Sequence, residues 1–410
     1  MITANKTVLN HKQLIWLMII LCIFCGCTSA VREENKETGP LKKLNPGEYP
    51  LFIDHMDYQG LLDSIDNSLT YFRKIPAQRP YTYENDIYPA SHMIKSLEIF
   101  KAFLEKGPSP SDLNELIKTR FFVYEAAGNE KNEVLFTGYF EPAYEGRLKK
   151  SNEFPFPLFS KPDDLLEIDL SSFSDQYKGH KRLTARVNEA TNEVIPYYSR
   201  KEITAIKDFH TRAEPVAWLK SRVDGFFLEI QGSGRVDLGN GDLLRVQYTA
   251  ANGRAYSSVG KYLIDQKEIS KENMSMQAIR QWLEAHPERV DEVLNYNQSY
   301  VFFRKETDGP YGSLGVKVTA FRSVATDSRL FPKGALCFIQ ARLPDKKAMD
   351  PQKEWEKASL FVLNQDTGGA IKGPARADLF CGNGEYAEFT SGYMKHYGRL
   401  FFLVLNPGKE

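Results

Sequence analysis

Two aspartates near the C-terminus have the surroundings of a carboxylate-based active site. Asp366 and Asp378 are 12 residues apart (378 − 366), and glycines are frequent around both. Short apolar runs at 361–363 and 400–404 flank them and are typical of buried strands. Glycine allows a ligand to approach the backbone closely, so a polymer could reach a carboxylate here. A carboxyl pair is what acid–base cleavage of a glycosidic bond requires, because the leaving oxygen must be protonated.

A third aspartate, Asp327, follows the segment 320–326 and precedes Ser-Arg. An aspartate in such a turn is more often a cap of its own loop than a catalyst. Beside Asp366 and Asp378 it completes a set of three carboxylates in one strand-rich region. Capping of loops remains the alternative reading for Asp327 and Asp366.

The sequence gives little support for nucleotide binding, a nucleophilic serine or a metal site. The glycine-rich stretch 231–241 leads into another strand rather than a helix, so it indicates a hairpin and not a phosphate loop. Ser233 within it lacks the setting of a nucleophilic serine. The seven histidines are scattered and no cysteine or histidine spacing suits a metal. We therefore expect no cofactor and no metal.

Composition is that of a globular protein: 410 residues, 42% hydrophobic and 26% charged. This length suffices for two substantial domains. The formal net charge of +0 gives no support for nucleic-acid binding, which usually leaves a basic excess.

The N-terminus resembles a bacterial lipoprotein signal. An apolar run at 14–24 follows Lys6 and Lys12, and it is shorter than the roughly 20 residues of a membrane span. We expect residues 1–27 to be the signal, with Cys27 as the lipidated residue; plain cleavage and an uncleaved anchor are the alternatives. Residues 28–46, charged and rich in proline, would form a tether. Thr28, where Asp would favour the inner membrane, indicates the outer membrane.

Apolar periodicity predicts helices first and strands afterwards. Helical patterns occupy 55–73, 90–106 and a segment from 109, and another covers 274–294. The expected strands are short and separated by Gly, Pro, Asn or Asp: 134–140, 154–159, 225–231, 243–249, 300–303, 316–321 and 335–341. The chain is therefore mainly β with N-terminal helices. Of the five cysteines, only Cys337 and Cys381 fall in this body, either paired or as free thiols.

Several long motifs resemble the lytic murein transglycosylase A family. They are TGYFEPAYEG (137–146), IQGSGRV (230–236), NGRAYSSVGKYLI (252–264), MSMQAIRQW (274–282), NQSYVFF (297–303) and the C-terminal block with three aspartates. The resemblance runs from about residue 50 to about residue 405.

What the resemblance implies for the fold is a double-psi β-barrel interrupted by a smaller β domain. The first part of the barrel domain, with the helices, would cover 47–141, the insertion 142–304 and the three-aspartate part 305–408. A groove between the domains would hold a glycan strand.

The resemblance also implies roles for residues. Asp378 would be the acid/base and Asp366 its supporting carboxylate, with Asp327 completing the set. Tyr139, Gln231 and Ser233 are candidates for substrate binding. Arg376, in the linker between the aspartates, departs from the family pattern, and a cation there would lower the pKa of a neighbouring carboxyl.

The implied reaction cleaves the β-1,4 bond between MurNAc and GlcNAc in peptidoglycan without water. The C6 hydroxyl of the muramic acid attacks instead, so one carboxyl donates a proton and then accepts one, giving 1,6-anhydromuropeptides. The enzyme would face the periplasm as an outer-membrane lipoprotein, with a cell-wall synthesis complex as a further partner. The alternatives are a water-using glycoside hydrolase on the same fold and a peptidoglycan-binding scaffold without activity.

Overall fold

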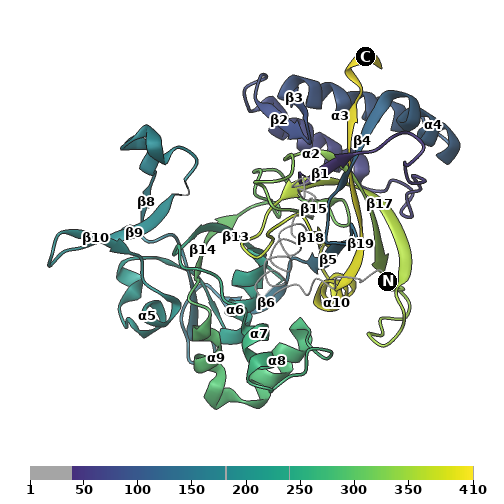
Figure 1. Cartoon of the computed structure of the whole chain (residues 1–410). Helices are drawn as coiled ribbons and strands as arrows, with labels where there is room; N and C mark the ends of the chain where they lie inside the picture. Colours follow the sequence, from purple (N-terminus) through teal and green to yellow (C-terminus); the bar gives the residue numbers. More distant parts are fainter. Residues whose placement is uncertain (1–38, 181, 240, 410) are drawn as a thin grey trace, which may run out of the picture. The chain divides into compact units, whose positions relative to one another are not determined.

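Six strands close into a barrel in the computed structural model, which describes residues 39–180, 182–239 and 241–409. They are β5 (Val134–Tyr139), β15 (Ser323–Ala325), β16 (Leu336–Leu343), β17 (Glu356–Asp366), β18 (Arg376–Phe380) and β19 (His396–Leu405). The ring runs β19-β16-β17-β15-β18-β5, and pairing of β19 with β5 closes it (Figure 1). Pairs β15–β17 and β18–β5 are parallel and the others antiparallel. The predicted barrel is confirmed.

Two further strands extend the barrel sheet beyond β19. β4 (Phe121–Ala126) pairs with β19, and β1 (Leu41–Lys43) pairs with β4. Residues 41–43 were expected in the tether, which can therefore extend no further than residue 40. Leu41 is buried in the main core, which explains why this segment joins the sheet. The predicted signal, Cys27 and the tether up to residue 38 lie outside the described residues.

Three N-terminal helices pack on the barrel sheet (Figure 1). They are α2 (Leu61–Arg73), α3 (Ala90–Leu104) and α4 (Pro110–Arg120), and a hairpin of β2 (Pro80–Tyr83) and β3 (Asp86–Pro89) separates α2 from α3. Their apolar faces share one core with the barrel strands. Ser109 caps α4, accepting from the amide of Asp112 while the Asp112 carboxylate accepts from Ser109. The three predicted helices are confirmed, although α2 begins six residues later than expected.

The chain between β5 and β15 forms a second β structure. Its main sheet has the order β14-β13-β12-β6-β11-β7. These strands are β6 (Ala143–Arg147), β7 (Phe156–Phe159), β11 (Pro215–Leu219), β12 (Ser233–Asp237), β13 (Leu243–Ala251) and β14 (Val301–Glu306). A small sheet, β10-β9-β8, adds β8 (Leu166–Ile168), β9 (Leu183–Asn188) and β10 (Glu193–Pro196). An inserted second β domain was predicted, and the structure contains it.

Helices complete the second β structure. They are α5 (Arg200–Ala205), α6 (Arg222–Gln231), α7 (Val259–Asp265), α8 (Met276–Ala285) and α9 (Val290–Tyr296). The predicted helical segment 274–294 is divided between α8 and α9, with a short 3-10 turn at Pro287–Arg289. A proline inside a helical pattern removes a backbone donor and interrupts the helix. The last helix, α10 (Glu385–Tyr393), belongs to the barrel part and contacts β5.

Two predicted strands are wrong. Residues 225–231 lie in α6. Ser221 caps the start of this helix, because its side chain accepts hydrogen bonds from the amides of Val223 and Asp224. Consecutive Phe226, Phe227 and Leu228 are all buried, and a short apolar run of this kind does not distinguish a buried helix from a strand. Residues 316–321 contain only an isolated bridge between Tyr311 and Lys317, followed by a turn.

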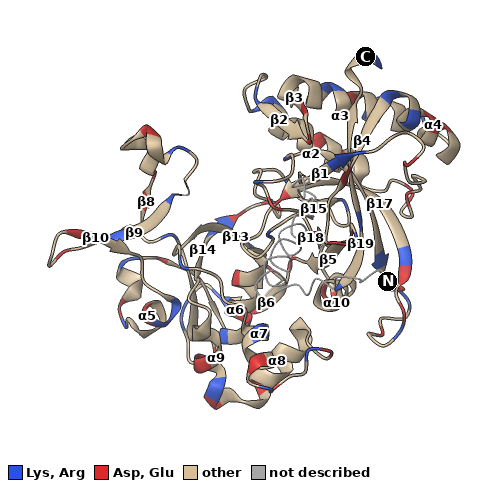
Figure 2. Ribbon diagram, in the orientation of Figure 1, with Lys and Arg blue, Asp and Glu red and all other residues tan. Residues whose placement is uncertain are grey.

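Basic and acidic residues are both scattered over the elements of the two β structures (Figure 2). Among the described residues, none of the helices has both the length and the apolar character that crossing a membrane requires.

Candidate active site

The barrel brings Asp366 and Asp378 to the two sides of one short strand. Ala325 in β15 is the register partner of Asp366 in β17 and of Asp378 in β18. Residues paired across neighbouring strands present their side chains on the same face of a sheet. The register therefore places these two carboxyl groups on the same face of the sheet, and the charge of Asp366 raises the pKa of Asp378.

Asp378 is positioned by the strand next to it. Thr137, its register partner in β5, donates from Oγ1 to Asp378 Oδ1 at 2.6 Å. Burial raises the pKa of Asp378 to about 6, and the nearby charge of Asp366 adds to the rise. The hydrogen bond from Thr137 and the charge of Arg376 lower the pKa and limit the shift. The expected effect of Arg376 is thus present, but desolvation outweighs it.

Asp366 is surrounded by donors. Its Oδ1 accepts from the amides of Ser313 and Thr367, each at 2.8 Å, and its Oδ2 accepts from the Tyr139 hydroxyl at 2.8 Å. Burial raises the pKa of Asp366, while these hydrogen bonds lower it because they favour the ionised form. The two carboxyls therefore differ: Asp366 accepts three hydrogen bonds, whereas Asp378 has one strong donor and a pKa close to neutral.

Asp327 is not hydrogen-bonded to either of these carboxylates in the described structure. It is only 1% exposed and binds Arg329 through its side chain, at 2.6 and 2.9 Å. Its Oδ2 also accepts from the amide of Gly373, at 2.9 Å. The Arg329 guanidinium holds the pKa of Asp327 well below its usual range. Asp327 thus stabilises the loop between β17 and β18. This role corresponds to the structural alternative given for Asp327 in the sequence analysis.

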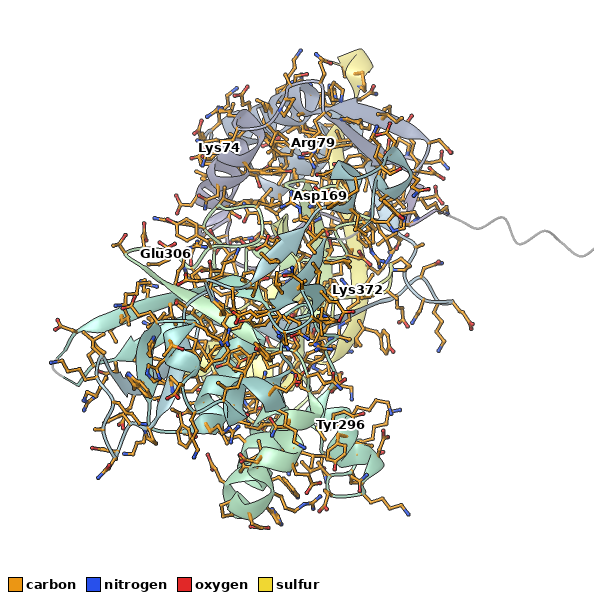
Figure 3. The ribbon with its side chains drawn as sticks, turned by 90° about the vertical axis from the view of Figure 1, so that its left-hand side faces the viewer. Lys74, Arg79, Asp169, Tyr296, Glu306 and Lys372 are labelled. Carbon is orange, nitrogen blue, oxygen red and sulfur yellow. The ribbon has the colours of Figure 1, made fainter. Side chains whose placement is uncertain are left out.

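That loop joins the two candidate catalytic strands. It includes Lys372, which is labelled in Figure 3. Gly373 has a φ of +83°, a left-handed conformation that suits glycine. Because Asp327 binds the amide of Gly373, glycine and aspartate together define how the chain turns from β17 towards β18.

The predicted substrate-binding residues lie at different distances from the pair. Tyr139 binds Asp366 directly and its ring lies 5.1 Å from that of Phe380. Gln231, at the end of α6, accepts from the amide of Phe140 at 3.1 Å and so links the second β structure to the strand carrying Tyr139. Ser233 in β12 is only 7% exposed, so little of it is available to a ligand in this conformation.

Two site residues were missed at the sequence level. Thr137 and Ser313 donate to the carboxylates, yet neither is close to them in sequence. Thr137 stands first in the motif TGYFEPAYEG, which was the available signal. Ser313 lies in a loop without an apolar pattern and gave none.

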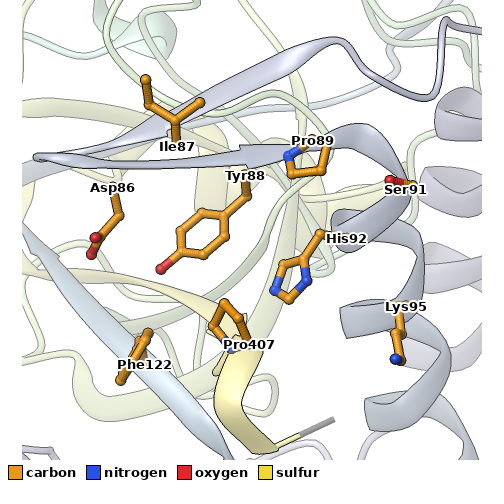
Figure 4. A pocket seen from close by; sticks show the side chains of 9 residues that line it. All are labelled: Asp86, Ile87, Tyr88, Pro89, Ser91, His92, Lys95, Phe122 and Pro407. Atoms are coloured by element: carbon orange, nitrogen blue, oxygen red, sulfur yellow. The ribbon is translucent and has the colours of Figure 1, made fainter.

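Two described cavities lie away from the carboxyl pair. One, of about 560 Å³, is formed by β3, the start of α3 and β4 (Figure 4). Its lining includes Asp86, Tyr88 and His92, and His92 Nε2 is 2.8 Å from the carbonyl of Leu405. The predicted groove beside Asp378 remains a proposal.

Within the described ranges, no group of three or more His, Cys, Asp or Glu is placed to bind a metal ion. Cys337 and Cys381 are both free and buried.

A pair of carboxyls with different environments is a feature of enzymes that cleave glycosidic bonds by acid–base chemistry. Comparison with known proteins narrows this class. Residues 135–304 match the MltA specific insert domain, and residues 322–404 match the 3D domain. The membrane-bound lytic murein transglycosylase A of Escherichia coli K12 is 34% identical over 287 residues, covering 69% of each chain. The chain belongs to the lytic murein transglycosylase A family.

Solved structures agree over nearly the whole length. A membrane-bound lytic murein transglycosylase from Agrobacterium tumefaciens superposes with a TM-score of 0.72 at 26% identity, covering 89% of this chain and 97% of that one. The E. coli MltA structure with bound chitohexaose has a TM-score of 0.68 at 26% identity, with coverages of 90% and 96%. A homologue from Buchnera aphidicola is 28% identical over 359 residues, which are 84% of this chain and 88% of that protein.

Proposed function

We propose that this enzyme cleaves the β-1,4 bond between MurNAc and GlcNAc in peptidoglycan by lytic transglycosylation, with Asp378 as its acid/base. Family membership supports the reaction, and one observation supports the residue. Burial raises the pKa of Asp378 to about 6, so about half of this carboxyl is protonated at pH 6 and roughly a tenth at pH 7. A general acid works best with a pKa near the operating pH.

The steps balance with a single carboxyl. Asp378 donates its proton to the glycosidic oxygen as the bond from C1 of MurNAc to that oxygen breaks, which releases the GlcNAc hydroxyl. The C6 hydroxyl of the same MurNAc then attacks C1, and its proton passes to the Asp378 carboxylate. The 1,6-anhydro bond forms, no water is consumed, and Asp378 is protonated again.

Asp366 has the environment of a charge-stabilising partner. Its hydrogen bonds from Ser313, Thr367 and Tyr139 support an ionised carboxylate. A negative charge beside the reaction centre stabilises an oxocarbenium-like transition state and favours protonation of its neighbour. We assign Asp366 this supporting role, and we assign Asp327 the role of holding the connecting loop.

The glycan strand would lie between the barrel and the inserted sheet. Tyr139 and Gln231 both stand where the two parts are joined, because Gln231 binds the amide of Phe140. The structure of E. coli MltA was solved with bound chitohexaose, which supports binding of a glycan by this fold. We propose that the insertion covers 142–304 and the three-aspartate part 305–408, and that the first segment covers 41–141 rather than 47–141, because β1 pairs with β4.

Membrane association is suggested by relatives that are named membrane-bound. We propose that it is achieved through a lipid on Cys27 after removal of the signal, in the outer membrane and facing the periplasm. The tether would then be residues 28–40.

Digestion of purified sacculi in H₂¹⁸O tests the reaction. We expect released muropeptides that end in 1,6-anhydroMurNAc and carry no ¹⁸O, because the C6 hydroxyl replaces water. Reducing ends labelled with ¹⁸O would show the enzyme to be a hydrolase on the same fold. Binding to sacculi without any released product would instead favour the scaffold alternative.

A further inference from the structure

The small sheet β10-β9-β8 has its apolar side turned away from the protein. Register pairs Ile168 with Leu183, Leu166 with Ala185, and Val187 with Val194. Paired residues share a face, so one side of the sheet is entirely apolar. We call this the outer apolar face; it consists of Leu166, Ile168, Leu183, Ala185, Val187, Val194 and Pro196.

The opposite side of the same sheet packs on the second β structure. Thr184 approaches Gly253 so closely that a Cβ at residue 253 would lie 2.5 Å from the Thr184 Cβ. The Arg186 guanidinium stacks on the ring of Tyr198 at 4.0 Å. An antiparallel sheet with one solvated face normally exposes its polar side. Here Thr184 and Arg186 of the polar side pack against the second β structure, whereas most of the apolar side is exposed; only Ala185, at the centre of the apolar side, is buried.

The exposed fractions of the side chains show that the apolar side of the small sheet faces solvent. Leu183 is 50% exposed and Val194 57% exposed, and Leu166 and Val187 are exposed as well. The connection from β8 to β9 adds Phe173, the most exposed large hydrophobic residue of the described chain. Contiguous apolar surface of this kind marks an interaction site in soluble proteins.

The chemistry of the face narrows its partner. Its side chains are aliphatic, whereas sugars stack on aromatic rings, so it does not suit the glycan. Seven small and medium side chains, partly exposed, offer on the order of 300 Å², well below the roughly 800 Å² per partner of a stable protein interface. Binding to a lipid surface has no such minimum area, because its strength increases with the apolar area that is buried, so a small face gives a weak contact.

Tethering makes a weak lipid contact effective. With Cys27 lipidated, as proposed above, only 13 residues (40 − 27) separate the bilayer from β1, a reach of about 45 Å when extended. A second contact then forms within one molecule, at an effective concentration in the millimolar range.

We propose that the outer apolar face rests on the bilayer to which the chain is anchored and so fixes the orientation of the enzyme. Charge contributes little to this contact. The neighbouring cations Lys178 and Arg182 are paired with Asp175 and with Asp169, which is labelled in Figure 3. The contact is therefore expected with zwitterionic as well as anionic lipid. It rests on the proposed membrane anchoring.

Depth-sensitive fluorescence on the full lipidated chain tests this orientation. The variants Val194→Cys and Ile87→Cys each receive one polarity-sensitive dye, because Cys337 and Cys381 are buried. Ile87 is 67% exposed and lies on β3, in the N-terminal hairpin, which makes it a matched control. Both proteins are reconstituted in vesicles of phosphatidylethanolamine and phosphatidylglycerol (about 3:1) that contain a brominated lipid.

We expect the dye at residue 194 to be quenched at least about twofold more strongly than the dye at residue 87, with little dependence on salt. Equal quenching in protein that sediments with the vesicles would overturn the face proposal alone. Failure of both proteins to sediment with vesicles would overturn the anchoring and the face proposal together. Shielding of residue 194 that increases with protein density and persists without the brominated lipid would show that the face binds a second copy.

Discussion

At the residue scale, the protonation of the two candidate catalytic carboxyls depends on how far each is removed from water. Desolvation is the largest influence on the pKa of Asp378, and it outweighs both the Thr137 hydroxyl and the Arg376 cation. Asp366 experiences similar burial but is supplied with three donors. Two aspartates of identical chemistry thus acquire different tendencies to hold a proton.

The raised pKa of Asp378 predicts how the stability of the variant Asp378→Asn changes with pH relative to the parent. Folding raises the pKa of Asp378 from 3.8 to about 6, so the folded parent binds the proton more tightly. The resulting stabilisation is complete below pH 3.8 and is lost as the pH rises through about 6. Asparagine does not titrate. As the pH rises from 4 to 7.5, the free energy of unfolding of the variant should therefore increase by about 1–3 kcal/mol relative to that of the parent.

Urea unfolding at both pH values measures this gain. Glu189→Gln, an exposed substitution near the β9–β10 turn, serves as the control and should leave the difference unchanged. A free energy of unfolding that differs from the parent's by the same amount at both pH values would argue against desolvation of Asp378.

At the element scale, the position of β17 is determined by helix α2. The side chain of Gln365 donates to the Ser64 carbonyl at 2.7 Å and to Ser68 Oγ at 3.0 Å, and it accepts from Ser323 Oγ at 2.6 Å. Gln365 is completely buried, so these bonds fix the strand one residue before Asp366. The helices, which carry no chemistry themselves, therefore hold the carboxylate in place.

The loop from β17 to β18 gives a prediction for Asp327→Asn. The amide group of asparagine replaces one acceptor that binds Arg329 and Gly373, so the free energy of unfolding should fall by about 2–3 kcal/mol at pH 7. Because Arg329 lowers the pKa of Asp327, this stabilisation is present above the ordinary pKa of 3.8 and lost in more acidic solution. Urea unfolding at pH 7 and pH 3 checks both statements.

Activity separates a structural from a catalytic role for Asp327. The folded variant should keep its anhydromuropeptide release within about tenfold of the parent, since the bonds of Asp378 are untouched. The exposed substitution Asp345→Asn is a suitable control. Normal stability combined with a complete loss of product would make Asp327 catalytic instead.

Sequence reasoning was most informative where the relevant information was local. The barrel strands β16, β17 and β19 followed from their continuous apolar runs. Asp366 and Asp378 were chosen as candidates because glycines and apolar strands surround both, and their roles stay a prediction. The hydrogen bond from Thr137 to Asp378 could not be predicted, because it joins residues 241 positions apart and depends on the register of β5 with β18. Segment 225–231 was misjudged because its apolar run is too short to reveal a helical period.

At the scale of the whole molecule, the second β structure contributes to the candidate site through Gln247. This side chain of β13 donates to the Tyr311 carbonyl at 2.9 Å and accepts from the Tyr311 amide at 3.0 Å. Two residues later, the amide of Ser313 binds Asp366. Because Gly312 lies so close to Gln365 that a Cβ would meet the Gln365 carbonyl at 2.6 Å, the loop has little freedom to shift.

Gln247→Ala is therefore expected to reduce activity more than stability. Loss of two hydrogen bonds should cost about 1–2 kcal/mol of unfolding free energy, whereas release of the loop should lower the turnover of sacculi by about 10- to 100-fold. Turnover and urea unfolding are measured on the same preparation. Gln266→Ala, at the exposed end of α7, should alter neither. Unchanged turnover in Gln247→Ala would contradict the coupling.

The central claim is that one carboxyl, Asp378, serves as both acid and base. Mass spectrometry of muropeptides released from sacculi by the parent, Asp378→Asn and Asp366→Asn tests it most directly. We predict that Asp378→Asn loses at least about 1,000-fold of anhydromuropeptide release, while Asp366→Asn still forms the same anhydro product at a reduced rate. Substantial anhydro product from folded Asp378→Asn would contradict the account.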